Sequence, residues 1–112
     1  MVDKAILITG CSSGIGECVA KGLQTRGYRV FATARQVADV QRLQSEGLES
    51  LVLDLDDSDS IRQAVDSVLQ KTDGQLYGLF NNGAYGQPGA VEDLSRDALR
   101  AQFETNLFGW LE

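Results

Sequence analysis

A loop rich in glycine and serine near the start of the chain has the residue types that can bind an anion. It follows an apolar run and consists of Gly10, Cys11, Ser12, Ser13, Gly14, Ile15 and Gly16. Glycines permit a tight turn and let a ligand approach the backbone, and the free N–H groups that open the following helix favour a negative group such as a diphosphate. The spacing Gly-x-x-x-Gly-x-Gly differs from the Gly-x-Gly-x-x-Gly of the commonest dinucleotide-binding fold, and no Lys follows as in a phosphate-binding P-loop. A glycine-rich turn without a ligand is the alternative interpretation.

Three further polar side chains follow apolar runs, where predicted strands would end. Arg35 offers a forked guanidinium that suits a phosphate, and the two residues before it are uncharged. An acid at such a position would bind the hydroxyls of a ribose, so Arg35 favours NADP over NAD. Asp54 could accept a hydrogen bond from an adenine amino group, and the amide of Asn82 could bind a ribose. The alternatives are a solvated Arg35, an Asp54 that only opens the next helix, and an Asn82 that bonds the backbone at the strand end.

Other side chains suited to chemistry are few. Asn106 lies among aromatic and aliphatic residues of the last predicted helix, where an amide often bonds within a kink or holds a water molecule; an exposed helical Asn is the alternative. Neither Tyr77 nor Tyr85 is followed by Lys four residues later, so neither resembles an activated phenol. The chain has no His and two Cys, which argues against a zinc site, a disulfide framework and a nucleophilic role for Cys11.

Strand-like and helix-like segments alternate four times along the chain. Strands are predicted over residues 4–9, 28–33, 51–53 and 76–80. Helices are predicted over residues 14–26, from 37 to just before Gly47, from 58 to just before Gly74, and after the capping residue Ser95. The buried face of the first helix is expected to hold Ile15, Val19, Ala20 and Leu23. This alternation is typical of an α/β fold, a Rossmann-like parallel sheet with helices on both faces.

The predicted fold also predicts where a ligand would bind. Ligands of parallel sheets bind beyond the carboxyl ends of the strands, because the loops that follow those ends meet at one edge. Thr9, Arg35, Asp54 and Asn82 all fall at or just past such ends. We therefore expect them to converge on one rim of the sheet.

The overall composition is that of one ordinary domain. The chain has 112 residues, of which 43% are hydrophobic and 23% charged, and its net charge is −6. The acidic balance argues against nucleic acid as a partner, and no apolar segment is long enough to span a membrane. The lack of a signal peptide and the few cysteines favour a cytoplasmic location. The apolar pattern of the last helix runs on to Glu112 without a stop signal, so we expect a fold truncated after about four strands.

Taken in order, these segments resemble the short-chain dehydrogenase/reductase family. The matching residues are Thr9-Gly10, Gly14-Ile15-Gly16, Asp54-Leu55, Asn81-Asn82-Gly83-Ala84 and Asn106. They cover essentially the whole chain, and the subgroup they resemble most contains the retinol- and hydroxysteroid-dehydrogenase-like enzymes of bacteria. The chain departs from the family after the paired asparagines, where the family has Ala then Gly and this chain has Gly83 then Ala84.

The resemblance implies a role for each matching position. The loop from Gly10 to Gly16 would wrap the diphosphate and adenosine side of the cofactor, and Arg35 would select the 2′-phosphate. Asp54 and the backbone of Leu55 would hold adenine, while Asn82 and Gly83 would touch the ribose region. Asn106 would serve catalysis by holding a water molecule in a proton relay. The family's catalytic Ser and its Tyr-x-x-x-Lys would come after the point where this sequence stops.

We therefore expect residues 1–112 to be the NADP-binding part of a longer oxidoreductase. The parent would move a hydride between NADP(H) and a small carbonyl or alcohol substrate, with NAD the less favoured cofactor. This part alone would bind nucleotide weakly at best and would turn nothing over; a homo-oligomer is left open. The alternatives are a free-standing, non-catalytic nucleotide-binding or sensor module and a methyltransferase-like domain, which Arg35 and the paired asparagines disfavour.

Overall fold

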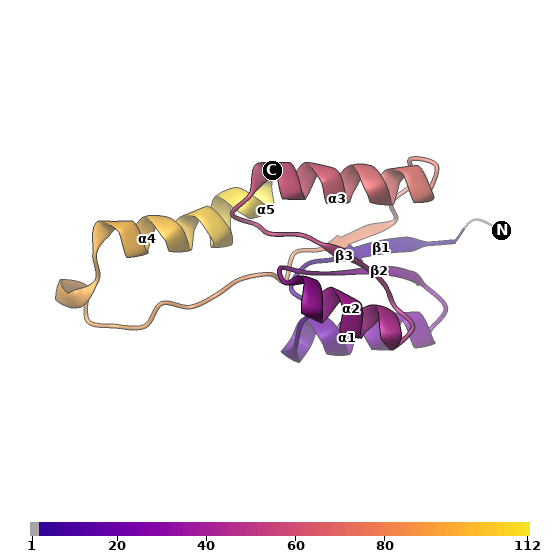
Figure 1. Cartoon of the computed structure of the whole chain (residues 1–112), viewed down its shortest axis with the longest axis horizontal. Coiled ribbons are helices and arrows are strands. Elements are labelled where there is room, and N and C mark those ends of the chain that lie inside the picture. Colours follow the sequence, from indigo (N-terminus) through magenta and orange to yellow (C-terminus); the bar gives the residue numbers. More distant parts are fainter. Residues whose placement is uncertain (1–2) are drawn as a thin grey trace.

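The computed structural model describes residues 3–112 as a four-stranded sheet with helices on both faces (Figure 1). All four strands are parallel and lie in the order β3-β2-β1-β4. The predicted α/β class and Rossmann-like sheet are thus confirmed. The elements are β1 (Ala5–Ile8), α1 (Gly14–Thr25), β2 (Arg29–Ala34), α2 (Val37–Ser45), β3 (Glu49–Val52), α3 (Ser58–Lys71), β4 (Gly78–Phe80), the 3-10 turn η1 (Val91–Asp93), α4 (Arg96–Phe103), the π-helical segment η2 (Glu104–Phe108) and α5 (Gly109–Leu111).

The sheet is buried on both faces between two layers of helices. Helices α1 and α2 cover one face and α3 covers the other (Figure 1). Successive side chains of a strand point to opposite faces, so Ile6 and Ile8 pack in the cluster with α1 and α2, whereas Leu7 packs with Phe31 and Val68 on the side of α3. Because both faces are covered, β1 is an unbroken apolar run and the centre of β2, residues 30–32, is apolar as well.

Two predicted details of the elements are wrong. The third strand begins at Glu49 rather than at residue 51, because the backbones of Glu49 and Ser50 pair with β2. Ladder hydrogen bonds use backbone groups, so polar side chains do not prevent pairing. Ile15 does not pack on the buried face of α1 and is 69% exposed, since Gly16 takes the buried position in that first turn.

Strand β4 is shorter and more exposed than the apolar run of residues 76–80 predicts. Its regular part is Gly78–Phe80, and among the described residues it pairs with β1 alone. Leu79 in its centre is 53% exposed. The lack of a neighbour on its second side explains both observations, because an edge strand buries less of its surface than a central one.

The chain after β4 forms an arm that leaves the sheet and returns to it (Figure 1). Helix α4 is capped as predicted, with the hydroxyl of Ser95 accepting from the amide of Ala98 at 3.1 Å. The π-helical segment η2 follows and contains Asn106, and the chain then reaches the start of α3, where Ser58 donates to the Glu112 carboxylate at 2.7 Å. Across residues 3–112, none of these helices is both long and apolar enough to cross a membrane.

Candidate functional site

The loops that follow β1 and β4 are joined at the carboxyl edge of the sheet by one threonine and one asparagine. The hydroxyl of Thr9 accepts from two backbone amides, those of Asn82 at 3.0 Å and Gly83 at 2.8 Å. In return, the Nδ2 group of Asn82 donates to the carbonyls of Thr9 at 3.3 Å and Gly10 at 3.1 Å. Strand β1 lies between β2 and β4, so the chain order reverses here, which is where open α/β sheets bind ligands.

Two glycines allow the first loop to pack this tightly. A Cβ atom at Gly16 would lie 2.2 Å from the carbonyl oxygen of Gly10 and 2.6 Å from Nδ2 of Asn82. Gly10 has a φ of +71°, and a Cβ atom there would lie 2.7 Å from the Cα atom of Gly83. Neither position accepts a side chain without moving backbone, so the loop keeps its shape through residues that have none.

No side chain caps the start of α1 or that of α2, unlike the starts of α3 and α4. Ser13 occupies the N-cap position in an extended conformation and makes no capping hydrogen bond. By contrast, Asp57 accepts from two amides at the start of α3, and Ser95 caps α4. The first N–H groups of a helix attract anions when nothing in the protein occupies them. The predicted diphosphate loop therefore presents donors that are free to bind a ligand.

A polar cleft of about 200 Å³ lies beside this loop, and most of the residues predicted from strand ends line it. Its lining includes Gly10, Ser12, Arg35, Asp54, Leu55 and Gly83. Arg35 is exposed, and no other residue within 3–112 accepts a hydrogen bond from its guanidinium. One carboxylate oxygen of Asp54 accepts from the amide of Asp56 at 3.0 Å, so the other remains for a ligand. A larger hollow of about 280 Å³ lies between the sheet and α3, but its lining is largely aliphatic.

Cys11 is the predicted loop residue that the structure turns away from the cleft. Its side chain is fully buried in the core, its amide donates to Thr33 at 2.8 Å, and its thiol lies 3.5 Å from the carbonyl of Ile8. Burial raises the pKa of this thiol to about 11. With amide and thiol both used inside the protein, Cys11 shapes the loop and offers neither group to a ligand.

The asparagines at the rim use their side chains to hold loops together. The Nδ2 group of Asn82 is engaged with the first loop, so within residues 3–112 only its side-chain oxygen is left without a hydrogen-bond partner. Asn106 holds Tyr85 by both backbone groups, accepting from its amide at 3.0 Å and donating to its carbonyl at 2.7 Å. The alternative of a merely exposed helical Asn106 is therefore wrong, and its interpretation as a residue of a helix irregularity fits η2.

The sequence interpretation missed two contributors to the rim. Thr9 was expected near the site but was given no task, although a hydroxyl at the end of an apolar run is a signal that it bonds there. Trp110, at the end of the arm, donates from its indole nitrogen to the carbonyl of Gly83 at 2.5 Å. No sequence signal links Trp110 to Gly83, because the two residues are 27 positions apart.

Comparison with known proteins identifies the family of this chain. Residues 4–112 match the family model described as short chain dehydrogenase. The chain belongs to the short-chain dehydrogenase family. Two solved members have similar folds: a variant of actinorhodin polyketide ketoreductase with NADPH (TM-score 0.86, 30% identity, 97% of this chain and 44% of that one) and a short-chain dehydrogenase from Streptomyces avermitilis (TM-score 0.87, 33% identity, 96% and 40%).

Similar curated proteins carry several different names. An uncharacterized oxidoreductase of Escherichia coli K12, YbbO, is 42% identical over 97% of this chain and 40% of its own length. The NADPH-dependent 1-acyldihydroxyacetone phosphate reductase of Schizosaccharomyces pombe is 37% identical over 96% and 36%, and rat retinol dehydrogenase 16 is 34% identical over 98% and 36%. The chain spans about 40% of the length of such relatives. Because their names differ in substrate, the expected retinol- and hydroxysteroid-dehydrogenase-like subgroup stays a prediction.

Proposed function

We propose that this chain is the NADP-binding part of an oxidoreductase that interconverts a carbonyl and an alcohol. The observation that carries the proposal is the convergence on one polar cleft of the glycine-rich loop that leads to the uncapped start of α1, a guanidinium at the end of β2 that is unpaired within residues 3–112, and a carboxylate after β3. These groups suit the diphosphate, the 2′-phosphate and the adenine of NADP, in that order. The bound cofactor would supply the hydride, and the protein would bind and orient it.

The proposed contacts follow from which groups are free. The amides of Ser13, Gly14 and Ile15 would bind the diphosphate, and Arg35 with the hydroxyl of Ser12 would bind the 2′-phosphate. Adenine would lie against Leu55, and its amino group would donate a hydrogen bond to the carboxylate of Asp54. The ribose region would lie near Gly83 and the free oxygen of Asn82. NAD, whose ribose carries no phosphate, would leave Arg35 without its partner.

The catalytic part of the proposal concerns Asn106. By clamping Tyr85 to η2, its side chain keeps the loop after β4 beside the cleft, while a π-helical turn leaves backbone carbonyls that can hold a water molecule. The sequence contains no Tyr followed four residues later by Lys, so we expect these 112 residues alone to bind cofactor without turnover. A small carbonyl or alcohol as substrate and a cytoplasmic location are parts of the same proposal.

Fluorescence titration with NADPH and NADH tests the cofactor proposal. We expect NADPH to bind about tenfold to a hundredfold more tightly than NADH, the range that charge-assisted hydrogen bonds to one phosphate supply. The Arg35→Ala variant should lose most of this preference while its affinity for NADH changes little. Equal affinity of the unmodified protein for both cofactors, or an Arg35→Ala variant that keeps the preference, would contradict the choice of NADP.

A further inference from the structure

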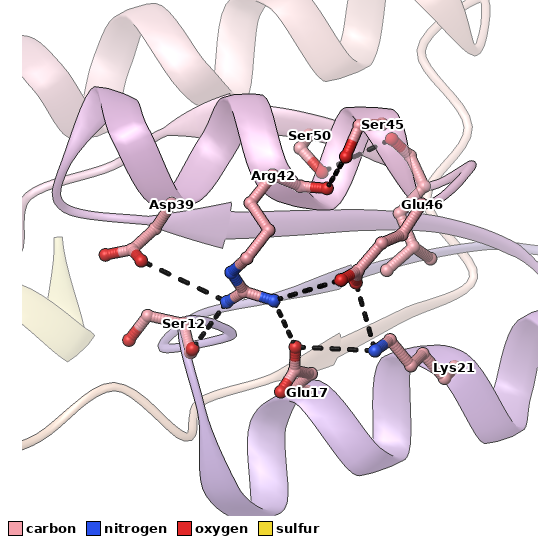
Figure 2. A network of polar contacts seen from close by, with 9 residues as sticks. Ser12, Glu17, Lys21, Asp39, Arg42, Ser45, Glu46 and Ser50 are labelled. Carbon is pink, nitrogen blue, oxygen red and sulfur yellow. Dashed lines mark hydrogen bonds and ion pairs between the residues drawn. The ribbon is translucent and has the colours of Figure 1, made fainter.

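A cluster of charged residues lies behind the glycine-rich loop, between α1 and α2 (Figure 2). At its centre is Arg42 of α2, whose guanidinium points toward the loop. One terminal nitrogen donates to the carbonyl oxygen of Ser12 at 2.7 Å, and the other donates to the Glu17 carboxylate of α1 at 2.5 Å. Lys21 and Glu46 extend the cluster away from the loop, with their charged atoms 3.0 Å apart.

The contact with Ser12 fixes the orientation of a peptide group in the proposed diphosphate loop. The peptide bonds of the described residues are all trans and planar, so the N–H of Ser13 points opposite to the C=O of Ser12. Because Arg42 holds that carbonyl on the α2 side, the amide of Ser13 faces away from α2. A guanidinium contact is stronger than an ordinary hydrogen bond, which suits it to holding a loop in which glycines supply no side-chain contacts.

The contact with Glu17 removes an electrostatic conflict at the same place. Glu17 lies in the first turn of α1, where the diphosphate is proposed to bind. The hydrogen bond from Arg42 lowers the pKa of this carboxyl below its usual 4.5, so it is charged at neutral pH. An unpaired carboxylate there would repel an anion, whereas the pairs with Arg42 and Lys21 offset its charge.

We infer that Arg42 is a positioning residue of the nucleotide site, which anchors the glycine-rich loop through Ser12 and neutralises Glu17. The inference rests on the proposed function, since it concerns the loop that would receive the diphosphate. It differs from the role of Arg35 in one measurable respect. NADPH and NADH share the diphosphate, so Arg42 should support both cofactors equally, whereas Arg35 should distinguish them.

Arg29 provides a matched control for Arg42 at the other end of the molecule. It too pairs with a carboxylate, that of Glu49 at 2.8 and 2.9 Å, and donates to a backbone carbonyl, that of Lys71 at 2.9 Å. It lies at the amino end of β2, far along the strand from the carboxyl edge. Each of the variants Arg42→Met and Arg29→Met removes a guanidinium bound to one carboxylate and one backbone carbonyl, behind the loop or remote from it. Arg42 in addition lies 3.5 Å from Glu46 and 4.0 Å from Asp39.

The experiment titrates NADPH and NADH into the full chain carrying each substitution. We expect Arg42→Met to weaken the binding of both cofactors by about tenfold with their ratio unchanged, and Arg42→Lys to give an intermediate loss because a single ammonium nitrogen replaces the two guanidinium nitrogens that bind Ser12 and Glu17. Arg29→Met should leave both affinities within about twofold, since it removes nothing near the loop. Amide hydrogen exchange at residues 12–16 should speed up in Arg42→Met alone.

Three results would overturn the inference. One is an Arg42→Met variant that binds both cofactors as tightly as the unmodified protein; another is an equal loss in Arg29→Met, which would show a general effect on stability. The third is an equal loss in Glu17→Gln, which keeps the Arg42–Ser12 contact and should bind as tightly or more tightly. If the unmodified protein binds neither cofactor, the proposed function itself fails, so the two failures are distinguishable.

Discussion

At the scale of single residues, the hydroxyl of Thr9 joins the loops that follow β1 and β4. It is 4% exposed and accepts from the amides of both Asn82 and Gly83, which belong to a loop more than 70 positions away. A buried N–H without a partner costs more than an ordinary hydrogen bond contributes. Thr9 thus joins the two loops and gives the buried amide of Gly83 its acceptor, whereas the amide of Asn82 also donates to the carbonyl of Phe80 at 3.1 Å.

The Thr9→Val substitution should therefore be unusually costly for an isosteric change. We expect a loss of about 2 kcal/mol in the free energy of unfolding, measured by urea titration, because the buried amide of Gly83 loses its acceptor while that of Asn82 keeps the carbonyl of Phe80. Thr33→Val is the matched control: Thr33 is fully buried, and its hydroxyl donates to the single carbonyl of Ile8 at 2.9 Å. It should lose about 1 kcal/mol. Equal losses in the two variants would show that the amide of Gly83 finds another acceptor.

At the scale of elements, the four longer helices fall into two kinds, since α3 and α4 have a side-chain cap whereas α1 and α2 have none. Helices α3 and α4 satisfy their first amides with the side chains of Asp57 and Ser95. Helix α1 leaves its first amides without a side-chain acceptor, although Ser13 is a residue type that caps well. An open helix start forgoes the stability that a cap contributes, and at α1 it lies beside the glycine-rich loop, where we propose that an anion binds.

This difference predicts unequal effects on stability for two alanine substitutions. Asp57→Ala should lower the free energy of unfolding by about 1 kcal/mol, because the amides of Asp59 and Ser60 lose their acceptor. Ser13→Ala should change it by less than about 0.5 kcal/mol, since no capping bond exists to be lost. Thermal or urea unfolding followed by circular dichroism measures both. A destabilisation by Ser13→Ala as large as that by Asp57→Ala would mean that α1 is capped in solution.

At the scale of the whole molecule, two arginines link neighbouring elements through carboxylates. Arg29 connects β2 to Glu49 of β3 and to the end of α3, and Arg42 connects α2 to Glu17 of α1. Hydrogen bonds from these arginines lower the pKa of Glu49 and of Glu17 below the usual 4.5. Both carboxylates are thus more acidic in the folded chain than in the unfolded one.

These lowered pKa values predict acid sensitivity. A carboxyl with a lower pKa in the folded state stabilises the fold above its unfolded pKa, and the contribution is lost as the pH falls through the folded value. These two carboxyls should therefore add no pH dependence to the urea midpoint above about pH 5, and the midpoint should decline below about pH 4.5. Glu49→Gln should reduce the steepness of that decline, and added salt should weaken it because both pairs are partly exposed. A decline that Glu49→Gln leaves unchanged would assign it to other carboxyls.

Much of the molecule follows from the sequence alone, because the signals involved are local. Apolar runs followed by helical apolar stripes specify strand, helix and the burial of both faces, and they predict a parallel sheet. Parallel strands place their carboxyl ends at one edge, so residues such as Arg35 and Asp54 could be assigned to one cleft without knowing any distance. The glycine spacing predicted the loop, and the resemblance carried by these motifs was sufficient to predict the family.

What only the tertiary structure decided is how each polar group at that edge is used. The sequence does not say that the side-chain amide of Asn82 donates to Gly10, that Cys11 is buried in the core, or that Arg42 binds Ser12, which is 30 positions away. Each of these depends on which groups happen to be adjacent after packing, and a residue's type restricts its partners without choosing among them. A hydrogen bond spans about 3 Å, so its partner is set by the final arrangement of the chain, whereas periodicity is written into neighbouring residues.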